Sequence, residues 1–150
     1  MTLDEHQAKL KGVLVELART QVGDALLTSL DMIAFVKLRL AEGGGNSQGG
    51  QFTDYSPIYS KRRQEKGLQV AHKDFNVTGQ LYASIQPQVK AASLGVVEVD
   101  IIPRGADKQM KVIGQLKRDG NILQPSQQEI DGATQAHQQR RFERAQKLFE

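Results

Sequence analysis

Apolar residues recur at helical spacing through the first forty residues of the chain. One set runs from Leu3 to Val22, and a second set, apolar over a wider arc, runs from Leu26 to Leu38. Gly23 separates the two sets, and a glycine inside a helix costs about 1 kcal/mol relative to alanine. The pattern predicts either one long helix with a weak point at Gly23 or two helices that break there.

Three places carry the residues of a helix start. Thr2 with Glu5, and Ser126 with Glu129, have the spacing of a capping box, in which a hydroxyl and a carboxylate each accept a free backbone amide. Ser56 is followed by a proline, which loses no hydrogen bond at the first position of a helix. We expect a helix of two or three turns there, with a glycine at position 67 to end it.

The middle of the chain predicts a β-hairpin. Apolar and polar residues alternate over 95–102, a weaker run covers 85–91, and the residues at 93–95 are typical of a turn. We expect residues 68–77 to be extended and Thr78 to cap a short helix before the first strand.

The last third of the chain returns to helical spacing. An apolar residue at every third position from Met110 to Leu116 predicts a helix that Gly120 ends, and the second capping box begins a final helix. The sequence thus predicts an α+β fold with a long N-terminal helix or helices, a small antiparallel β-sheet and C-terminal helices. The expected core includes Leu26, Leu30, Ile33, Leu81, Ile85, Val97, Val99, Ile101, Ile113 and Leu116.

The composition changes abruptly after the first helix. Residues 41–52 hold five glycines, which predicts a flexible loop over about 41–56. No Gly-Lys-Ser/Thr follows and no strand precedes it, so it does not have the pattern of a phosphate-binding loop. With 150 residues, the chain has the length of a single domain, 1–150.

Composition and charge exclude several classes of protein. The chain has no cysteine, which removes disulfide frameworks, cysteine nucleophiles and cysteine metal sites. No run approaches 18 apolar residues, so we expect no membrane partner. The polar, acidic start MTLDEH is unlike a signal peptide. The net charge of +3 is too small to indicate nucleic-acid binding by itself.

Candidate catalytic and metal-binding residues are scattered. His6, His72 and His137 lie far apart, and none belongs to a metal-binding spacing. Glu98 and Asp100 share the polar face of the better strand, where we interpret them as solvent-facing rather than as an acid–base pair. We therefore expect no metal, no cofactor and no enzymatic activity; an enzyme of unrecognised type is the third of three hypotheses.

Two basic clusters could contact phosphates or another protein, although such runs are more often the solvated face of a helix. Together with a pI of about 9.2, they support an alternative function as a small basic DNA-binding or DNA-packaging accessory protein, with non-specific DNA contact. The candidate contact residues are Lys61, Arg62, Arg63, Arg140, Arg141 and Arg144.

One ordered set of motifs is more specific than any of these features. A helix ending in LRL precedes the glycine-rich loop and an aromatic residue, Phe52. YSPIYSKRRQEKG, DFNVTGQLYASI, the hairpin and ILQPSQQEID follow in that order. Over residues 26–150 this set resembles the tail-completion and head–tail joining (neck) proteins of tailed bacteriophages, the phage virion morphogenesis family.

The family's T-G-x-L-x-x-S-I box matches Thr78, Gly79, Leu81, Ser84 and Ile85. The family's aromatic and arginine-rich segment before the last helix is absent, because residues 121–125 read NILQP.

The resemblance implies a structural role in the virion. Such a protein forms part of a ring with other copies of itself at the head–tail junction, between portal or adaptor proteins and tail proteins. It implies assembly in the cytoplasm of the host bacterium and a final location in the virion. We expect the 41–56 loop to order only on assembly.

Overall fold

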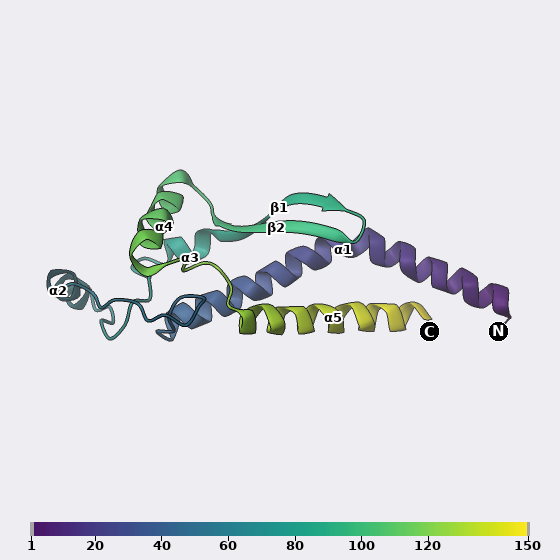
Figure 1. The fold of residues 1–150 in the computed structure, drawn as a ribbon, viewed down its shortest axis with the longest axis horizontal. Helices are drawn as coiled ribbons and strands as arrows, with labels where there is room; N and C mark the ends of the chain where they lie inside the picture. The colour runs from purple at the N-terminus through teal and green to yellow at the C-terminus, as the bar shows by residue number, and fades with distance from the viewer. Residues whose placement is uncertain (1, 150) are drawn as a thin grey trace.

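The computed structural model describes residues 2–149 and has an α+β fold, as predicted (Figure 1). No helix within these residues is both long enough and apolar enough to span a membrane. Along the chain the elements are α1 (Leu3–Ala41), α2 (Pro57–Glu65), α3 (Gln80–Ser84), β1 (Ile85–Ser93), β2 (Val96–Pro103), α4 (Ala106–Asp119) and α5 (Gln127–Phe149).

The N-terminal helix is continuous, so the alternative of two helices is wrong. α1 has 39 residues and a length of about 58 Å at 1.5 Å per residue. Its capping box forms as predicted, with Thr2 and Glu5 each accepting the other's backbone amide. Gly23 lies within the helix, whose packing therefore outweighs the cost of a glycine.

The two strands form an antiparallel hairpin that lies along α1 (Figure 1). Ile85 pairs with Pro103 at one end and Ser93 with Val96 at the other. The Gln21 side chain on α1 holds the turn, because it donates to the Ser93 carbonyl and accepts the Gly95 amide, both at 2.9 Å. The alternating pattern is confirmed, since Val97, Val99 and Ile101 of β2 are half-buried and the carboxylates at 98 and 100 are exposed.

The last helix runs antiparallel to α1 on another side of it, so both termini lie at one end of an elongated molecule (Figure 1). The capping box at its start forms as predicted, through Ser126 and Glu129. Glu129 also pairs with Arg39 of α1 at 2.8 Å.

The core is small and lies where α1 meets the start of the hairpin and the link between α4 and α5. Its buried residues are Ile33, Val36, Leu40, Ile85, Ile122 and Leu123. Ile33 and Ile85 confirm the prediction, whereas Leu26, Leu81, Val97, Val99 and Ile101 are half-buried.

Three residues predicted for the core are on the surface. Leu30, Ile113 and Leu116 are each 48% exposed, so this part of the prediction is wrong. In α4 the residue that packs against the core is Val112. Helical spacing correctly placed Met110, Ile113 and Leu116 on one side of α4. That side is exposed and does not pack against the core.

The start of α3 also differs from the prediction. Thr78 does not cap it; Gly79 occupies the cap position with a left-handed φ of 73°, and no side chain bonds the first turn. Asn76 Oδ1 instead accepts the Gly79 amide at 2.8 Å. The glycine is required because residues with a side chain rarely adopt this conformation.

The glycine-rich loop folds back on itself around Asn46. The Asn46 carbonyl accepts the Gly49 amide, and its side-chain oxygen accepts the Gly50 amide, both at 3.0 Å. Arg39 reaches from α1 to the Gly45 carbonyl at 2.6 Å. The glycine-rich composition predicts a flexible segment. In the structure these hydrogen bonds give the backbone of the loop a defined path.

Candidate functional site

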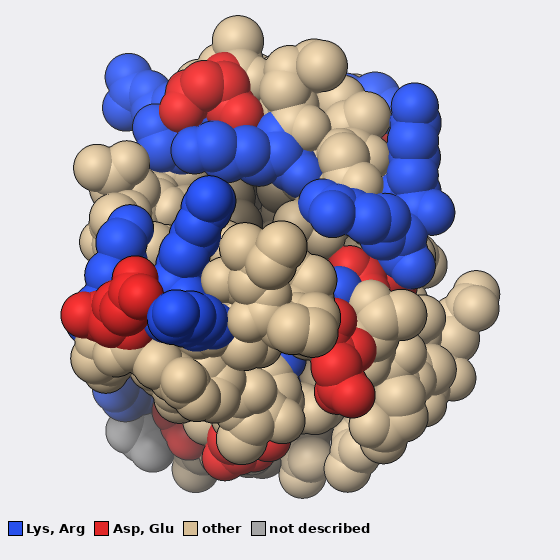
Figure 2. All heavy atoms as spheres, turned by 90° about the vertical axis from the view of Figure 1, so that its left-hand side faces the viewer, with Lys and Arg blue, Asp and Glu red and all other residues tan. Residues whose placement is uncertain are grey.

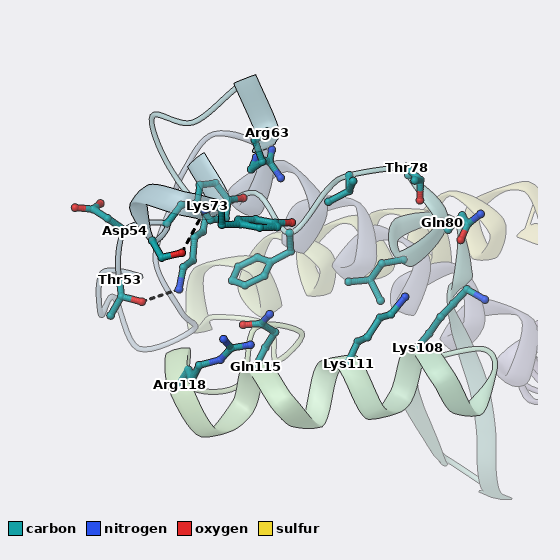
Figure 3. Close-up of a pocket in the computed structure, with 17 residues that line it drawn as sticks. Thr53, Asp54, Arg63, Lys73, Thr78, Gln80, Lys108, Lys111, Gln115 and Arg118 are labelled. Atoms are coloured by element: carbon teal, nitrogen blue, oxygen red, sulfur yellow. Dashed lines mark hydrogen bonds between the residues drawn. The ribbon is translucent and has the colours of Figure 1, made fainter. Parts of the chain in front are cut away.

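A cavity of about 730 Å³ lies at the end of the molecule opposite the termini, between α2 and α4 (Figure 3). Residues 53–56 and 73–81 complete its wall. Its apolar lining is provided by Tyr55, Tyr59, Phe75, Val77 and Leu81.

α4 supplies a row of polar side chains along one side of this cavity. Lys108, Lys111, Gln115 and Arg118 are three or four residues apart, so they leave the helix on one face. Figure 3 shows them extending from α4 toward the cavity. Lys111 and Arg118 are exposed, and no carboxylate within residues 2–149 forms an ion pair with either.

The buried Arg63 holds α2 against the opposite wall. Its guanidinium donates to the Gln69 carbonyl at 2.9 Å, to the Asn76 carbonyl at 3.1 Å and to Asp74 Oδ1 at 3.0 Å. It also lies 4.6 Å from the centre of the Tyr55 ring, a cation–π distance. Since Arg63 is only 2% exposed, its role is to fix the wall and not to meet a ligand.

The Asp74 carboxylate is stabilised in its charged form. Its burial alone would raise its pKa, but hydrogen bonds from Gln69, the Asn76 amide and Tyr55, together with the charge of Arg63, lower the pKa overall. At neutral pH the pair with Arg63 is therefore fully charged.

The floor of the cavity contains a residue in an unusual backbone conformation. Phe75 has a left-handed φ of 55°, which is uncommon for a residue with a bulky side chain. Its ring packs edge-on against Phe52, with the two ring centres 5.0 Å apart.

The hydroxyl of Tyr82 donates a hydrogen bond to the carbonyl of Asp74. Burial raises the pKa of Tyr82, so the hydroxyl stays protonated and remains a donor.

Lys73 joins the end of α4 to the segment before α2. Its ammonium lies 3.1 Å from Asp119 Oδ1 and 2.6 Å from the Thr53 hydroxyl, the latter drawn as a dashed line in Figure 3. The Asp119 side chain is fully buried in this cluster. Lys73 and Arg63 are thus neutralised cations that build the wall, in contrast to Lys111 and Arg118.

The Thr-Gly-x-Leu-x-x-Ser-Ile segment, residues 78–85, lies at this site. Thr78, Gly79 and Leu81 line the cavity, whereas Ser84 bonds the Leu81 carbonyl and Ile85 is buried in the core. This segment therefore connects the cavity to the first strand of the hairpin.

The first basic cluster is divided by the structure. Lys61 and Arg62 are exposed on α2, whereas Arg63 is buried in the cavity wall. Figure 2, which views this end of the molecule, shows Lys and Arg side chains over much of the face with fewer Asp and Glu between them.

The second basic cluster faces α1. Arg144 lies 2.7 Å from Asp24, Arg141 lies 3.8 Å from the same carboxylate, and Arg140 lies 2.7 Å from Asp31. The three arginines of α5 are thus paired within the chain, so they offer less free charge to a phosphate than the exposed cations of α2 and α4 do.

The sequence interpretation missed the cations of α4 and the wall cation Lys73. The spacing of Lys108, Lys111 and Arg118 was a usable signal, but it was obscured by the apolar stripe on the same helix. The partners of Lys73 are 20 and 46 residues away in sequence, so no local pattern marks them.

The histidines are in different parts of the fold. His72 bonds the Ala41 carbonyl and His137 bonds the Thr28 hydroxyl, while His6 lies near the Phe149 ring. No cluster of three or more potential metal ligands is present within residues 2–149.

Comparisons of the chain with protein-family models, curated proteins and solved structures gave no match.

Proposed function

We propose that this protein is a structural component of a tailed-phage virion, acting at the head–tail junction as a subunit of a ring. The resemblance of its ordered motifs to neck and tail-completion proteins motivates the proposal. The observation that carries it is the amount of apolar surface that the single chain leaves exposed on separate faces.

Three groups of exposed apolar side chains lie on different parts of the molecule. By helical spacing, one group shares a side of α1, a second shares the outer side of α4, and a third lies at the end that holds the termini. The three groups are Leu27, Leu30 and Leu38; Met110, Ile113 and Leu116; and Leu3, Phe142 and Leu148. Extended apolar surface of this kind is typical of contacts with other proteins.

Several separate surfaces suit a subunit that touches more than one neighbour. A ring uses two different patches of each copy, one for each adjacent copy, and still needs surface for the proteins above and below. The hairpin adds a further contact element, because no third strand within residues 2–149 pairs with it and its outer edges are open to another chain.

The proposal is tested in the phage genome that encodes the chain. A stop codon in place of Leu10 should give heads and tails that remain separate in negative-stain images, and a plasmid copy of the wild-type gene should restore joined particles. A charge-neutral disruption of one apolar surface, Ile113→Ser with Leu116→Ser, should give the same defect while the protein still folds. Normal infectious particles from the stop mutant would refute the proposal.

The alternative, a small DNA-binding or DNA-packaging accessory protein, is favoured by one observation. Lys61, Arg62, Lys111 and Arg118 are exposed at the same end of the molecule. This hypothesis predicts duplex DNA binding whose affinity falls steeply between 50 and 200 mM salt, on the order of tenfold or more for several phosphate contacts. A flat salt response in a fluorescence-anisotropy titration would remove it.

A further inference from the structure

We propose that the cavity between α2 and α4 is a docking site for an acidic polypeptide segment that carries an apolar anchor side chain and belongs to another protein. The inference is independent of the virion proposal, because it rests only on the charge, shape and rigidity of this cavity.

The charge of the cavity is strongly unbalanced. Five cationic side chains line it, and Asp54 is the single carboxylate among the lining residues. Figure 3 shows the Asp54 carboxylate turned away from the cavity. Arg63 and Lys73 are neutralised by Asp74 and Asp119, and Lys108 lies 3.7 Å from Asp107, which leaves Lys111 and Arg118 on α4 as the free charge. An anionic ligand is the complement of that charge.

The floor of the cavity favours a side chain over a nucleic acid base. Bases bind proteins by stacking on open aromatic faces. Here Arg63 lies over the Tyr55 ring at 4.6 Å, Tyr59 is tilted against Tyr55 at 5.3 Å, and Phe75 packs edge-on against Phe52, so the lining rings contact one another at an angle. The remaining apolar lining is aliphatic and includes Val77 and Leu81. Such a lining accepts an aliphatic or aromatic anchor.

The wall is already built before any ligand arrives. Arg63, Asp74 and Tyr55 are mutually bonded, and Phe75 is held in a left-handed conformation by its surroundings. Strained residues of this type persist where the surrounding structure fixes them, and they gather at binding sites. A preformed cavity reduces the ordering cost that a flexible site would incur on binding.

The test uses the full chain, ¹⁵N-labelled, titrated with defined probes and followed by amide NMR shifts. The probe is acetyl-Glu-Asp-Phe-Glu-Asp-Leu-Glu-amide, and the comparison probes are its neutral Gln/Asn counterpart, a twelve-nucleotide dT strand and inorganic phosphate. We expect saturable shifts from the acidic peptide at residues 53–59, 73–81 and 108–118. Binding should weaken at least tenfold in a variant with Lys111→Glu and Arg118→Glu.

The matched control variant carries Lys61→Glu and Arg62→Glu, which makes the same change of charge on α2 outside the cavity lining. It should retain peptide binding, and all four substituted side chains are exposed, so both variants should melt as the wild type does. Absence of saturable shifts, equal binding of the neutral peptide, or equal loss in both variants would overturn the proposal. Tighter binding of the dT strand would assign the cavity to nucleic acid, and equal binding of phosphate would reduce it to a simple anion site; either would also overturn it.

Discussion

Arg144 on α5 places its guanidinium 2.7 Å from the carboxylate of Asp24 on α1, although the two residues are 120 positions apart. The same guanidinium donates to the Thr20 hydroxyl at 2.6 Å, and Asp24 is only 1% exposed. A buried charge without its partner is costly. This contact therefore fixes the register in which α5 lies along α1.

Replacing Asp24 with alanine should destabilise the fold by about 3–5 kcal/mol, because Arg144 and Arg141 would remain partly buried without a counter-charge. Urea unfolding followed by circular dichroism measures this. Asp31→Ala is the matched control: the Asp31–Arg140 pair is about one-third exposed, so its loss should cost less than about 1 kcal/mol. Equal effects of the two substitutions would show that burial does not determine the strength of these pairs.

Truncating Ile122 should be far more damaging than truncating Ile113, the reverse of what helical spacing suggests. Ile122 is fully buried, so Ile122→Ala should cost about 2–5 kcal/mol through lost burial and a residual cavity. Ile113 is 48% exposed, so Ile113→Ala should stay within about 1 kcal/mol. Melting temperatures of both variants give the comparison, and similar losses would contradict the placement of α4.

These two isoleucines show what the sequence could and could not predict about the fold. Local chemistry marked the elements well: both capping boxes form, Ser56 caps α2, and alternation placed the strands. Helical spacing shows which residues share a face but not which face meets the body. Ile122 lies in a link too short for any periodicity, so its burial had no sequence signal.

The candidate site was less predictable because it depends on pairings across the chain. A run of three basic residues gave no sign that Arg63 turns inward while its two neighbours stay exposed. That division arises from Asp74, eleven residues later, which supplies the buried counter-charge. Likewise, the arginines of α5 looked available until Asp24 and Asp31 were seen to face them.

Gly45→Ala should disrupt the glycine-rich loop. A Cβ at position 45 would lie 1.9 Å from the carbonyl oxygen of Gly50, and a backbone atom cannot move away as a flexible side chain can. We expect a cost on the order of 1–3 kcal/mol, as for other overpacked sites. Gly23→Ala is the control, since nothing lies within 4 Å of its Cβ position; it should stabilise α1 by about 0.5–1 kcal/mol. Destabilisation by both, or by neither, would contradict the loop path.

The Asp74 carboxylate should give the fold a specific acid sensitivity, because hydrogen bonds from Gln69, the Asn76 amide and Tyr55, together with the charge of Arg63, favour its ionised form. The pKa of Asp74 is lowered from its ordinary value of 3.8 in the folded chain, so the folded state holds the proton less tightly than the unfolded state does. The stability from this group is therefore fully present above pH 3.8 and is lost as the pH falls through the lowered pKa.

Asp74→Asn isolates this contribution from that of the other carboxylates. The variant should be less stable than the wild type at pH 7, and the difference in unfolding free energy should shrink as the pH falls below 3.8. Urea titrations of both proteins between pH 2 and pH 7 measure the difference directly. A difference that stays constant over this range would mean that the ionisation of Asp74 does not contribute to stability, and would contradict the lowered pKa.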